Sequence, residues 1–307
     1  MDRWLAMRVF ARVAESGGFA PAARQLDMSP PAVTRIVAAL EETIGTRLLV
    51  RTTRSVKLTD AGARYLDDCR RILADIDEAE AAAAGSYAKP TGTLTVTAST
   101  LFGQLYVLPI ITEFLDLHRA VSAHAVFVDR VTNLVDEGID VAVRIGPLRD
   151  SGYRAIRVGA VRRVVCASPA YLERAGRPAT PSDLTGHEIV ASIAARGSND
   201  WEFGTTQKIV ATVVPRLSCN TNAAAISAAI EGRGLTRVLS YQVAPAIAAG
   251  QLVTVLDEHE EAPWPIHVVH GEGRRVTAKV RAFVDLAVER LRADARLAQS
   301  ERAARPD

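Results

Sequence analysis

The chain has 307 residues, 48% of them hydrophobic, and its formal net charge at pH 7 is +2. This length fits two domains of ordinary size, and the apolar content excludes a disordered chain. Because the net charge is close to zero, affinity for an anionic polymer has to come from a local basic patch. The N-terminal sequence MDRWLAMRVF carries charges and no long apolar run, so we expect no signal peptide and a cytoplasmic protein.

A helix is predicted after Asp2, ending at Gly17-Gly18. The next segment, FAPAARQLDMSPPAVTRIVAALE (residues 19–41), predicts two short helices joined by a tight turn. Ser29 is an N-cap for the second helix, and Pro30 stands at its first position, where a missing N–H does not matter. One face of this second helix is an apolar stripe with helical spacing, made of Val33, Ile36, Val37 and Leu40.

The opposite face of the second helix is suited to a groove of DNA. It offers small residues for close approach, a hydroxyl and one cation: Pro31, Thr34, Arg35 and Ala38. Arginine pairs bidentately with guanine in the major groove. An ordinary amphipathic helix with a solvated face is the alternative, and the flanking sequence favours the DNA interpretation.

The flanking segment RTTRSVKLT (residues 51–59) alternates β-branched residues with cations and contains no acid, which predicts a two-stranded wing. Cations of such a wing reach the phosphates beside the groove. A helix-turn-helix followed by a basic wing is a winged DNA-binding domain. We therefore expect DNA contacts from Ser29, Pro30, Pro31, Thr34, Arg35, Arg51, Thr53, Arg54 and Lys57.

Residues 60–84 are rich in alanine, contain no proline and predict a long helix. A short heptad seam recurs there at alternating steps of three and four, and Glu80 weakens its last turn: Leu66, Cys69, Leu73, Ile76, Glu80 and Ala83. The seam has two interpretations, packing on the chain's own first domain or pairing with a second copy. We favour pairing, because no second apolar stripe nearby could cover the seam. Dimer contacts are expected from Leu66, Leu73 and Ile76.

After a hinge-like segment, GSYAKPTG (residues 85–92), short β-branched runs alternate with helical patterns. This alternation predicts an α/β architecture with parallel sheets. The expected strands are 94–98, 125–128, 141–145, 163–168, 188–193, 235–239 and 266–270. The expected helices are 103–118, 131–137, 169–175, 222–231, 241–248 and 276–292.

Over its first sixty residues the chain resembles the LysR-type transcriptional regulators. The matching residues are Phe10, Ser16, Phe19, Ala22, Ala23, Leu26, Ser29, Pro30, Ala32, Val33, Arg35, Leu40, Glu41, Gly45, Leu48, Leu49, Arg51, Thr59 and Ala61-Gly62. Pro31 departs from the family, which often has a polar residue there, and Thr34 replaces a frequent serine. The resemblance continues more loosely in residues 136–152, 168–178, 234–253 and 267–291.

The resemblance implies a mainly α N-terminal winged helix-turn-helix domain with a linker helix, followed by an α/β, two-lobed, periplasmic-binding-protein-like domain. The first domain would span residues 1–59, with the helix-turn-helix at 19–38, and the linker helix and hinge would span 60–89. The effector-binding domain would span 90–307. Its lobe I would comprise about 92–162 and 268–296, and its lobe II about 163–267, with crossing strands near 161–165 and 264–268.

A small molecule is expected at the carboxyl ends of strands, where ligands of open α/β sheets bind, often at helix N-termini. Two such ends carry polar side chains, Ser99-Thr100 in the first lobe and Asn220-Thr221 in the second. In the family's architecture they would face each other across a cleft, with Arg144 and Gly146 in one wall. The alternative is that Ser99 and Asn220 serve only as helix caps.

No motif for catalysis or metal binding is present in the sequence. There is no HExxH, P-loop or nucleophile elbow, and His267 and His270 lack an acidic partner at zinc spacing. We therefore expect no enzyme and no cofactor apart from a small-molecule co-inducer. A cytoplasmic small-molecule-binding protein or enzyme with an accessory helical domain is the alternative function.

The expected partners follow from the resemblance. They are double-stranded DNA with a roughly palindromic operator, a small-molecule effector and further copies of the chain. The family pairs through its linker helix and commonly forms tetramers, so a homodimer and a homotetramer are both expected. RNA polymerase is a candidate further partner, and no membrane is expected.

Overall fold

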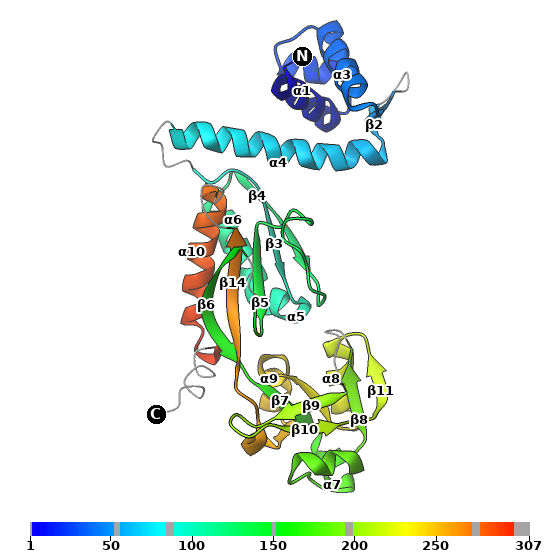
Figure 1. The fold of residues 1–307 in the computed structure, drawn as a ribbon, viewed down its shortest axis with the longest axis vertical. Helices are drawn as coiled ribbons and strands as arrows, with labels where there is room; N and C mark the ends of the chain where they lie inside the picture. Colours follow the sequence, from blue (N-terminus) through cyan, green and yellow to red (C-terminus); the bar gives the residue numbers. More distant parts are fainter. Residues whose placement is uncertain are drawn as a thin grey trace. The chain divides into compact units, whose positions relative to one another are not determined.

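The computed structural model describes residues 2–51, 56–83, 89–148, 152–193, 199–271 and 277–297. The chain forms two compact units, Met1–Lys89 and Pro90–Asp307 (Figure 1). Two of the expected DNA contacts, Thr53 and Arg54, lie outside the described residues.

The first unit combines short helices, a hairpin and a long helix. Its elements are α1 (Arg3–Ser16), α2 (Phe19–Gln25), α3 (Pro30–Ile44), β1 (Leu49–Arg51), β2 (Val56–Leu58) and α4 (Asp60–Ala83). Local signals set the helix ends: the Asp2 carboxylate accepts the Leu5 amide at 3.1 Å, and Gly45 ends α3 with a left-handed φ of 75°. The strands β1 and β2 pair antiparallel, so the expected wing hairpin is present.

One apolar core holds the first unit together, and α4 contributes to it. Phe10 of α1 and Val37 of α3 are fully buried in this core. Leu66 of α4 is only 6% exposed in the same core, and Leu73 packs against it. The helix α1 packs directly on α4. The premise that nothing in the chain covers the heptad seam is therefore wrong for Leu66, Cys69 and Leu73, because α1 provides the missing apolar stripe.

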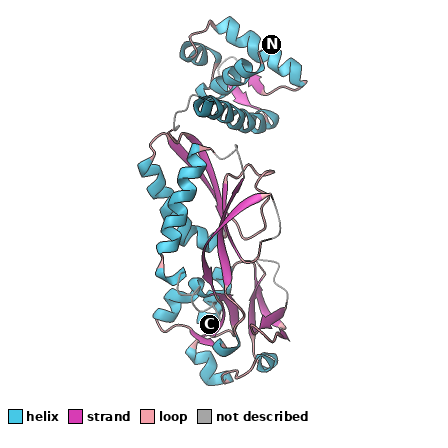
Figure 2. Cartoon of the chain, turned by 60° about the vertical axis from the view of Figure 1, so that its left-hand side comes forward, coloured by secondary structure: helices cyan, strands magenta, loops and turns pink. Residues whose placement is uncertain are grey.

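The second unit begins with a lobe built on a five-stranded sheet of order β4-β3-β5-β14-β6. Its elements are β3 (Gly92–Ala98), α5 (Thr100–Phe102), η1 (Gly103–Val107), α6 (Leu108–Leu117), β4 (Val121–Phe127), β5 (Val141–Ile145), β6 (Tyr153–Val161), β14 (Trp264–Gly271) and α10 (Ala278–Ala293). The helices α6 and α10 lie along one side of the sheet (Figure 2). Phe114 and Phe283 join them, with ring centroids 5.3 Å apart.

The second lobe is inserted between β6 and β14. Its elements are β7 (Arg163–Ala167), α7 (Pro169–Ala175), η2 (Pro181–Gly186), β8 (Ile189–Ser192), β9 (Asp200–Phe203), β10 (Ile209–Thr212), β11 (Pro215–Cys219), α8 (Asn222–Ile230), β12 (Thr236–Leu239), α9 (Ser240–Ala248), β13 (Val253–Val255) and η3 (Asp257–His259). The strand β7 lies between β12 and β13, and β8 pairs in parallel with β11. Apolar clusters cover both faces of β7.

Three details differ from the expectations. The sheets are mixed, because β14 runs antiparallel to both β5 and β6. The strand β14 starts at Trp264, so residues 264–267 belong to the first lobe. Residues 131–137 form no helix, and a turn covers 134–138, because the Asn133 side chain accepts the Val135 amide at 3.1 Å and Gly138 has φ 62°. Such local side-chain hydrogen bonds compete with a helix.

The stretch Thr100–Leu117 is the one helix among the described residues that is long and apolar enough to cross a membrane, with a mean hydropathy of 1.3. Its inner face carries Phe102, Ile111 and Phe114, which are buried in the core of the first lobe. This stretch is therefore a core helix of the α/β unit.

Candidate functional site

The exposed face of α3 carries the side chains that were expected to contact DNA. Arg35 is exposed, while Val33 and Val37 are fully buried on the other side of the helix. The first turn of α3 is also exposed, at the cap residue Ser29 and at Pro30 and Pro31. The helix therefore presents its N-terminal turn and one guanidinium group outward, as a recognition helix does.

Two hydroxyl groups on α3 make hydrogen bonds within the helix. Thr34 Oγ1 donates to the Pro30 carbonyl at 2.9 Å. Ser29 Oγ accepts the Ala32 amide at 3.4 Å. A base that meets Thr34 would therefore find a hydrogen-bond acceptor, whereas Ser29 keeps its proton for donation.

The wing is anchored by a carboxylate of α3 and by a hydroxyl at its own end, and sequence reasoning did not identify either as a positioning group. Glu41 Oε1 accepts the amides of Leu48 and Leu49 at 2.8 and 3.0 Å. Thr59 Oγ1 donates to the Arg47 carbonyl at 2.9 Å and accepts the Gly62 amide at 2.9 Å. These bonds fix both ends of the hairpin. On that hairpin Lys57 is exposed, and Arg51 is the last residue of β1.

Gly62 allows α4 to approach the start of the hairpin. A Cβ atom at this position would lie 1.9 Å from the Leu48 carbonyl oxygen, which is a backbone atom that cannot turn away. The Ala61-Gly62 pair that carried part of the family resemblance therefore has a steric reason in this fold.

The expected dimer contacts on α4 fall into two groups, those that touch the core of the first unit and one that does not. Leu66 belongs to the core of the first unit, and Leu73 packs against that core. Ile76 is only partly buried and lies outside the core cluster. Of the three expected dimer contacts, Ile76 is therefore the one that lies outside the core of the first unit.

In the first lobe, the end of β3 is capped by a carboxylate of the chain itself. Thr100, which begins the helix after β3, donates its amide to Asp129 Oδ1 at 2.9 Å. Its hydroxyl lies 3.5 Å from the Phe127 carbonyl. The backbone donor that was expected to help form an anion cradle is thus already engaged, by Asp129 from the loop after β4.

Tyr241 of α9, in the second lobe, contacts the first lobe next to the end of β3. Its ring makes edge contacts with Phe102 and Tyr106, at 5.3 and 5.9 Å between centroids. Burial raises the pKa of Tyr241 to about 12, against a smaller lowering by the Ser99 hydroxyl. The Ser99 oxygen is itself buried without a hydrogen bond of good geometry, so the Tyr241 hydroxyl is the polar group it faces. Sequence reasoning missed Tyr241, which sits at the start of an expected helix.

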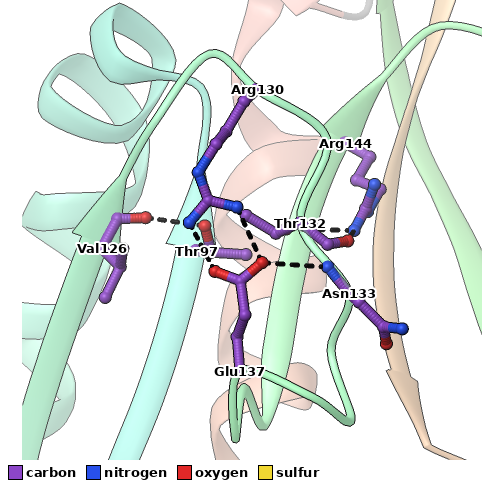
Figure 3. Close-up of polar contacts among 7 residues, drawn as sticks. All are labelled: Thr97, Val126, Arg130, Thr132, Asn133, Glu137 and Arg144. Atoms are coloured by element: carbon purple, nitrogen blue, oxygen red, sulfur yellow. Dashed lines mark hydrogen bonds and ion pairs between the residues drawn. The ribbon is translucent and has the colours of Figure 1, made fainter.

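The end of β5 carries Arg144 and Gly146. Arg144 donates to both oxygens of Thr132, in the loop that joins β4 to β5 (Figure 3). Burial lowers the pKa of Arg144. Gly146 has φ 105°, and its amide donates to the Pro265 carbonyl at 2.9 Å. Because Ala98 of β3 pairs with Val143 of β5, these residues lie at the same sheet edge as Ser99 and Thr100.

The same loop contains an ion pair that closes it on itself. Arg130 and Glu137 point toward each other, with the closest nitrogen and oxygen 2.6 Å apart (Figure 3). Glu137 also accepts the Asn133 amide at 3.2 Å. Arg130 holds the pKa of Glu137 below its ordinary value. The loop that supplies Asp129 is therefore internally braced.

In the second lobe, Asn220 and Thr221 lie between β11 and α8. Thr221 is the N-cap of α8, and its hydroxyl accepts the Ala224 amide at 3.2 Å. Asn220 is exposed. Among the described residues, no hydrogen bond or ring contact joins either side chain to the first lobe. Their cap role is observed, and their contact with an effector stays a prediction.

Other chemistry is sparse in the described part of the chain. No group of three or more His, Cys, Asp or Glu side chains there could hold a metal ion. Burial raises the pKa of Cys69 to about 11 and that of Cys166 to about 12, which keeps both thiols protonated and unreactive.

A winged helix-turn-helix with an exposed arginine, together with an α/β unit of two lobes with polar strand ends, defines a DNA-binding regulator with a ligand domain. Residues 4–63 match the family described as bacterial regulatory helix-turn-helix protein, lysR family, and residues 88–292 match the LysR substrate binding domain. The chain belongs to the LysR family of transcriptional regulators.

Several transcriptional regulators are similar to this chain over most of its length. It is 32% identical to the HTH-type transcriptional regulator CrgA of Neisseria meningitidis over 286 residues, which are 93% of this chain and 96% of CrgA. It is 31% identical to the HTH-type transcriptional activator AaeR of Escherichia coli over 287 residues, 93% of each chain. A transcriptional repressor of Pseudomonas aeruginosa is 32% identical over 94% of this chain and 92% of its own. Relatives at this distance thus include both an activator and a repressor.

The fold is that of solved family members. The structure of Neisseria meningitidis CrgA matches with a TM-score of 0.59 and 30% identity, over 94% of this chain and 98% of CrgA. The full-length Vibrio cholerae virulence activator AphB matches with a TM-score of 0.60 at 23% identity, over 92% of this chain and 98% of AphB.

Proposed function

We propose that this regulator reads an operator by placing α3 in the major groove and the β1–β2 wing on the adjacent phosphates. The observation that carries the proposal is Arg35, which is exposed on the face opposite the buried Val33 and Val37. Thr34 would accept a hydrogen bond from a base, since its own proton is donated within the helix. Lys57 and Arg51, with Thr53 and Arg54 of the same sequence segment, would contact phosphates.

The effector is proposed to bind at the strand ends of the α/β unit, between Ser99 and Thr100 of the first lobe and Asn220 and Thr221 of the second. The support is the concentration of polar groups at one sheet edge, including a buried Ser99 oxygen without a well-placed partner. Arg144 and Gly146 end the neighbouring strand of that edge. An effector shifts the regulator only by binding one arrangement of the lobes better than another.

The regulator is proposed to act in the cytoplasm as a homodimer or homotetramer, without catalysing a reaction. Ile76 and the turns of α4 beyond it would supply the dimer contact. A dimer places two recognition helices on one duplex, which favours a roughly palindromic operator. RNA polymerase is a proposed further partner when the regulator is bound beside a promoter.

Gel-shift titrations test the DNA-binding part. The full chain is titrated against a duplex taken from beside its own gene and against a random duplex of equal length at one salt concentration. We expect at least about a thousandfold tighter binding to the first duplex. Equal affinities for both duplexes contradict sequence-specific regulation there.

A paired substitution tests the effector site. Compounds that change DNA binding are first found by screening small carboxylates, amides, amines and aromatic compounds. Thr100→Val should then abolish the response while DNA binding without effector stays intact. Thr112→Val, an exposed threonine on α6, is the matched control. A normal response in Thr100→Val contradicts the proposed position of the pocket.

A further inference from the structure

We propose that Asp129 sets the charge selectivity of the effector site, so that the group an effector presents to Thr100 is a hydrogen-bond donor or a cation and not a carboxylate. The inference rests on the proposed position of the effector site. It reverses the simplest expectation for this strand end, which is that a helix N-terminus with free amides attracts an anion.

The first observation is that an anion already occupies the position. The Asp129 carboxylate accepts the Thr100 amide at 2.9 Å, at the first turn of the long helix that follows β3. A carboxylate from an effector would need the same amide and would lie beside a fixed like charge. Two carboxylates sharing one site repel each other strongly at partly buried positions.

The second observation is the hydrogen-bonding capacity left at this point. Asp129 Oδ1 takes the Thr100 amide, and Asp129 Oδ2 accepts no hydrogen bond from any residue that the structure describes. The Thr100 hydroxyl is directed to the Phe127 carbonyl. The atoms free to bind a ligand are therefore dominated by a carboxylate oxygen, which an N–H donor satisfies.

The third observation is that the nearby cations are engaged elsewhere. Arg130 forms a two-pronged ion pair with Glu137, at 2.8 and 2.6 Å. Arg144 donates to the carbonyl and hydroxyl of Thr132. The other acids between β4 and β5 are engaged away from Thr100: Glu137 by Arg130, Asp136 by the Asn133 side chain, and Asp140 by the Thr95 amide at 2.8 Å. Among the described residues, neither guanidinium group makes a hydrogen bond or ion pair with Asp129; their partners are Glu137 and Thr132 (Figure 3).

Matched compounds on the full-length protein test the inference. Ring scaffolds such as benzene, phenol and indole are each supplied as the carboxylate, the carboxamide and the aminomethyl compound, and dissociation constants are measured by calorimetry. For wild type we expect the amide or amine of at least one ring to bind about tenfold tighter than its carboxylate. Asp129→Asn should reduce that preference below about threefold, because the asparagine oxygen still accepts the Thr100 amide while the charge is gone.

Asp136→Asn is the matched control, since Asp136 is an exposed acid of the same loop that bonds locally, to the Asn133 side chain. It should leave the preference unchanged. The inference is overturned if the carboxylates bind wild type most tightly, if Asp129→Asn leaves the preference unchanged, or if no compound of any form binds.

Thr100→Val separates this inference from the proposed effector site. If Thr100→Val weakens carboxylates and amines alike while Asp129→Asn leaves their ratio unchanged, the site stands and the charge selectivity fails. If Thr100→Val affects no compound that binds, the proposed site fails and the charge selectivity fails with it.

Discussion

Arg162 and Glu260 join the two segments that cross between the lobes, with one guanidinium nitrogen of Arg162 lying 3.0 Å from each carboxylate oxygen of Glu260. The next residue on each segment repeats the contact, since Arg163 donates to Glu261 at 2.9 Å. Arg162 also exchanges backbone and side-chain hydrogen bonds with Ser240, where α9 begins. The connection between the two lobes is therefore braced by side chains as well as by the two chain segments that cross it.

Glu260 should make the stability of the α/β unit depend on pH. Burial raises the pKa of Glu260 above its ordinary value, although Arg162 acts in the other direction. An acid with a raised pKa binds more protons in the folded state, so the free energy of unfolding rises as pH falls through the folded-state pKa toward that of the unfolded chain. Glu260→Gln removes this gain. Thermal unfolding from pH 7 to about pH 4 should therefore show wild type gaining stability relative to the variant.

The control for Glu260 is the exposed Glu258, whose change to Gln should leave the pH profile of the melting temperature as in wild type. At pH 7, Glu260→Gln should be at least as stable as wild type. A variant that is much less stable at pH 7 and regains stability in acid contradicts the assignment.

Gly62→Ala should destabilise the DNA-binding unit by about 1–3 kcal/mol or more, because the added Cβ meets the Leu48 backbone. The strain falls on the junction of hairpin and α4, so DNA binding should weaken as well. Calorimetric unfolding measures the loss. Gly186→Ala, where a Cβ meets no atom within 4 Å, is the control and should be close to neutral.

Ile76→Asp should weaken self-association while leaving the melting temperature of the first unit nearly unchanged, because Ile76 lies outside its core. Leu66→Asp should instead unfold that unit, since it puts a charge into a fully packed site. Sedimentation of the full chain at several concentrations measures the association. Ile76→Asp with an unaltered dimer would place the dimer contact away from this part of α4.

Lys57→Ala should weaken binding to all DNA sequences alike and make the slope of log affinity against log salt shallower by about 0.9, the loss of one phosphate contact. Binding titrations between about 50 and 200 mM salt measure the slope. Arg12→Ala, which removes an exposed cation from α1, is the control and should leave the slope unaltered. The same slope in both variants would mean that the wing is not on the phosphate backbone.

The recognition helix and the wing could be predicted from sequence because their signals are local. The Ser29 cap, Pro30 in the first turn and the apolar spacing of Val33, Val37 and Leu40 act within one helix. The alternation in residues 51–59 likewise depends on neighbours across one short hairpin. Such short-range rules hold wherever the rest of the chain does not override them.

What covers a surface could not be predicted in the same way. The heptad spacing of Leu66, Cys69 and Leu73 identifies an apolar stripe but carries no information about its partner, which is α1. Asp129 reaches the Thr100 amide from a loop 29 residues away, and Tyr241 reaches Phe102 from the other lobe. Contacts of this kind are set by the tertiary fold. The hydrogen bond from the Thr100 amide to Asp129 therefore could not be predicted from the sequence.

The central claim is that α3 reads bases through Arg35, and its most direct test is the specificity ratio of Arg35→Ala. Affinities for the duplex from beside the chain's own gene and for a random duplex are measured at one salt concentration, for wild type, Arg35→Ala and Arg12→Ala. We predict that Arg35→Ala loses about 1–3 kcal/mol of binding free energy on the specific duplex and less on random DNA. The ratio of specific to random affinity should therefore fall in Arg35→Ala and stay at the wild-type value in Arg12→Ala. A ratio in Arg35→Ala equal to that of wild type would contradict the assignment of α3 as the recognition helix.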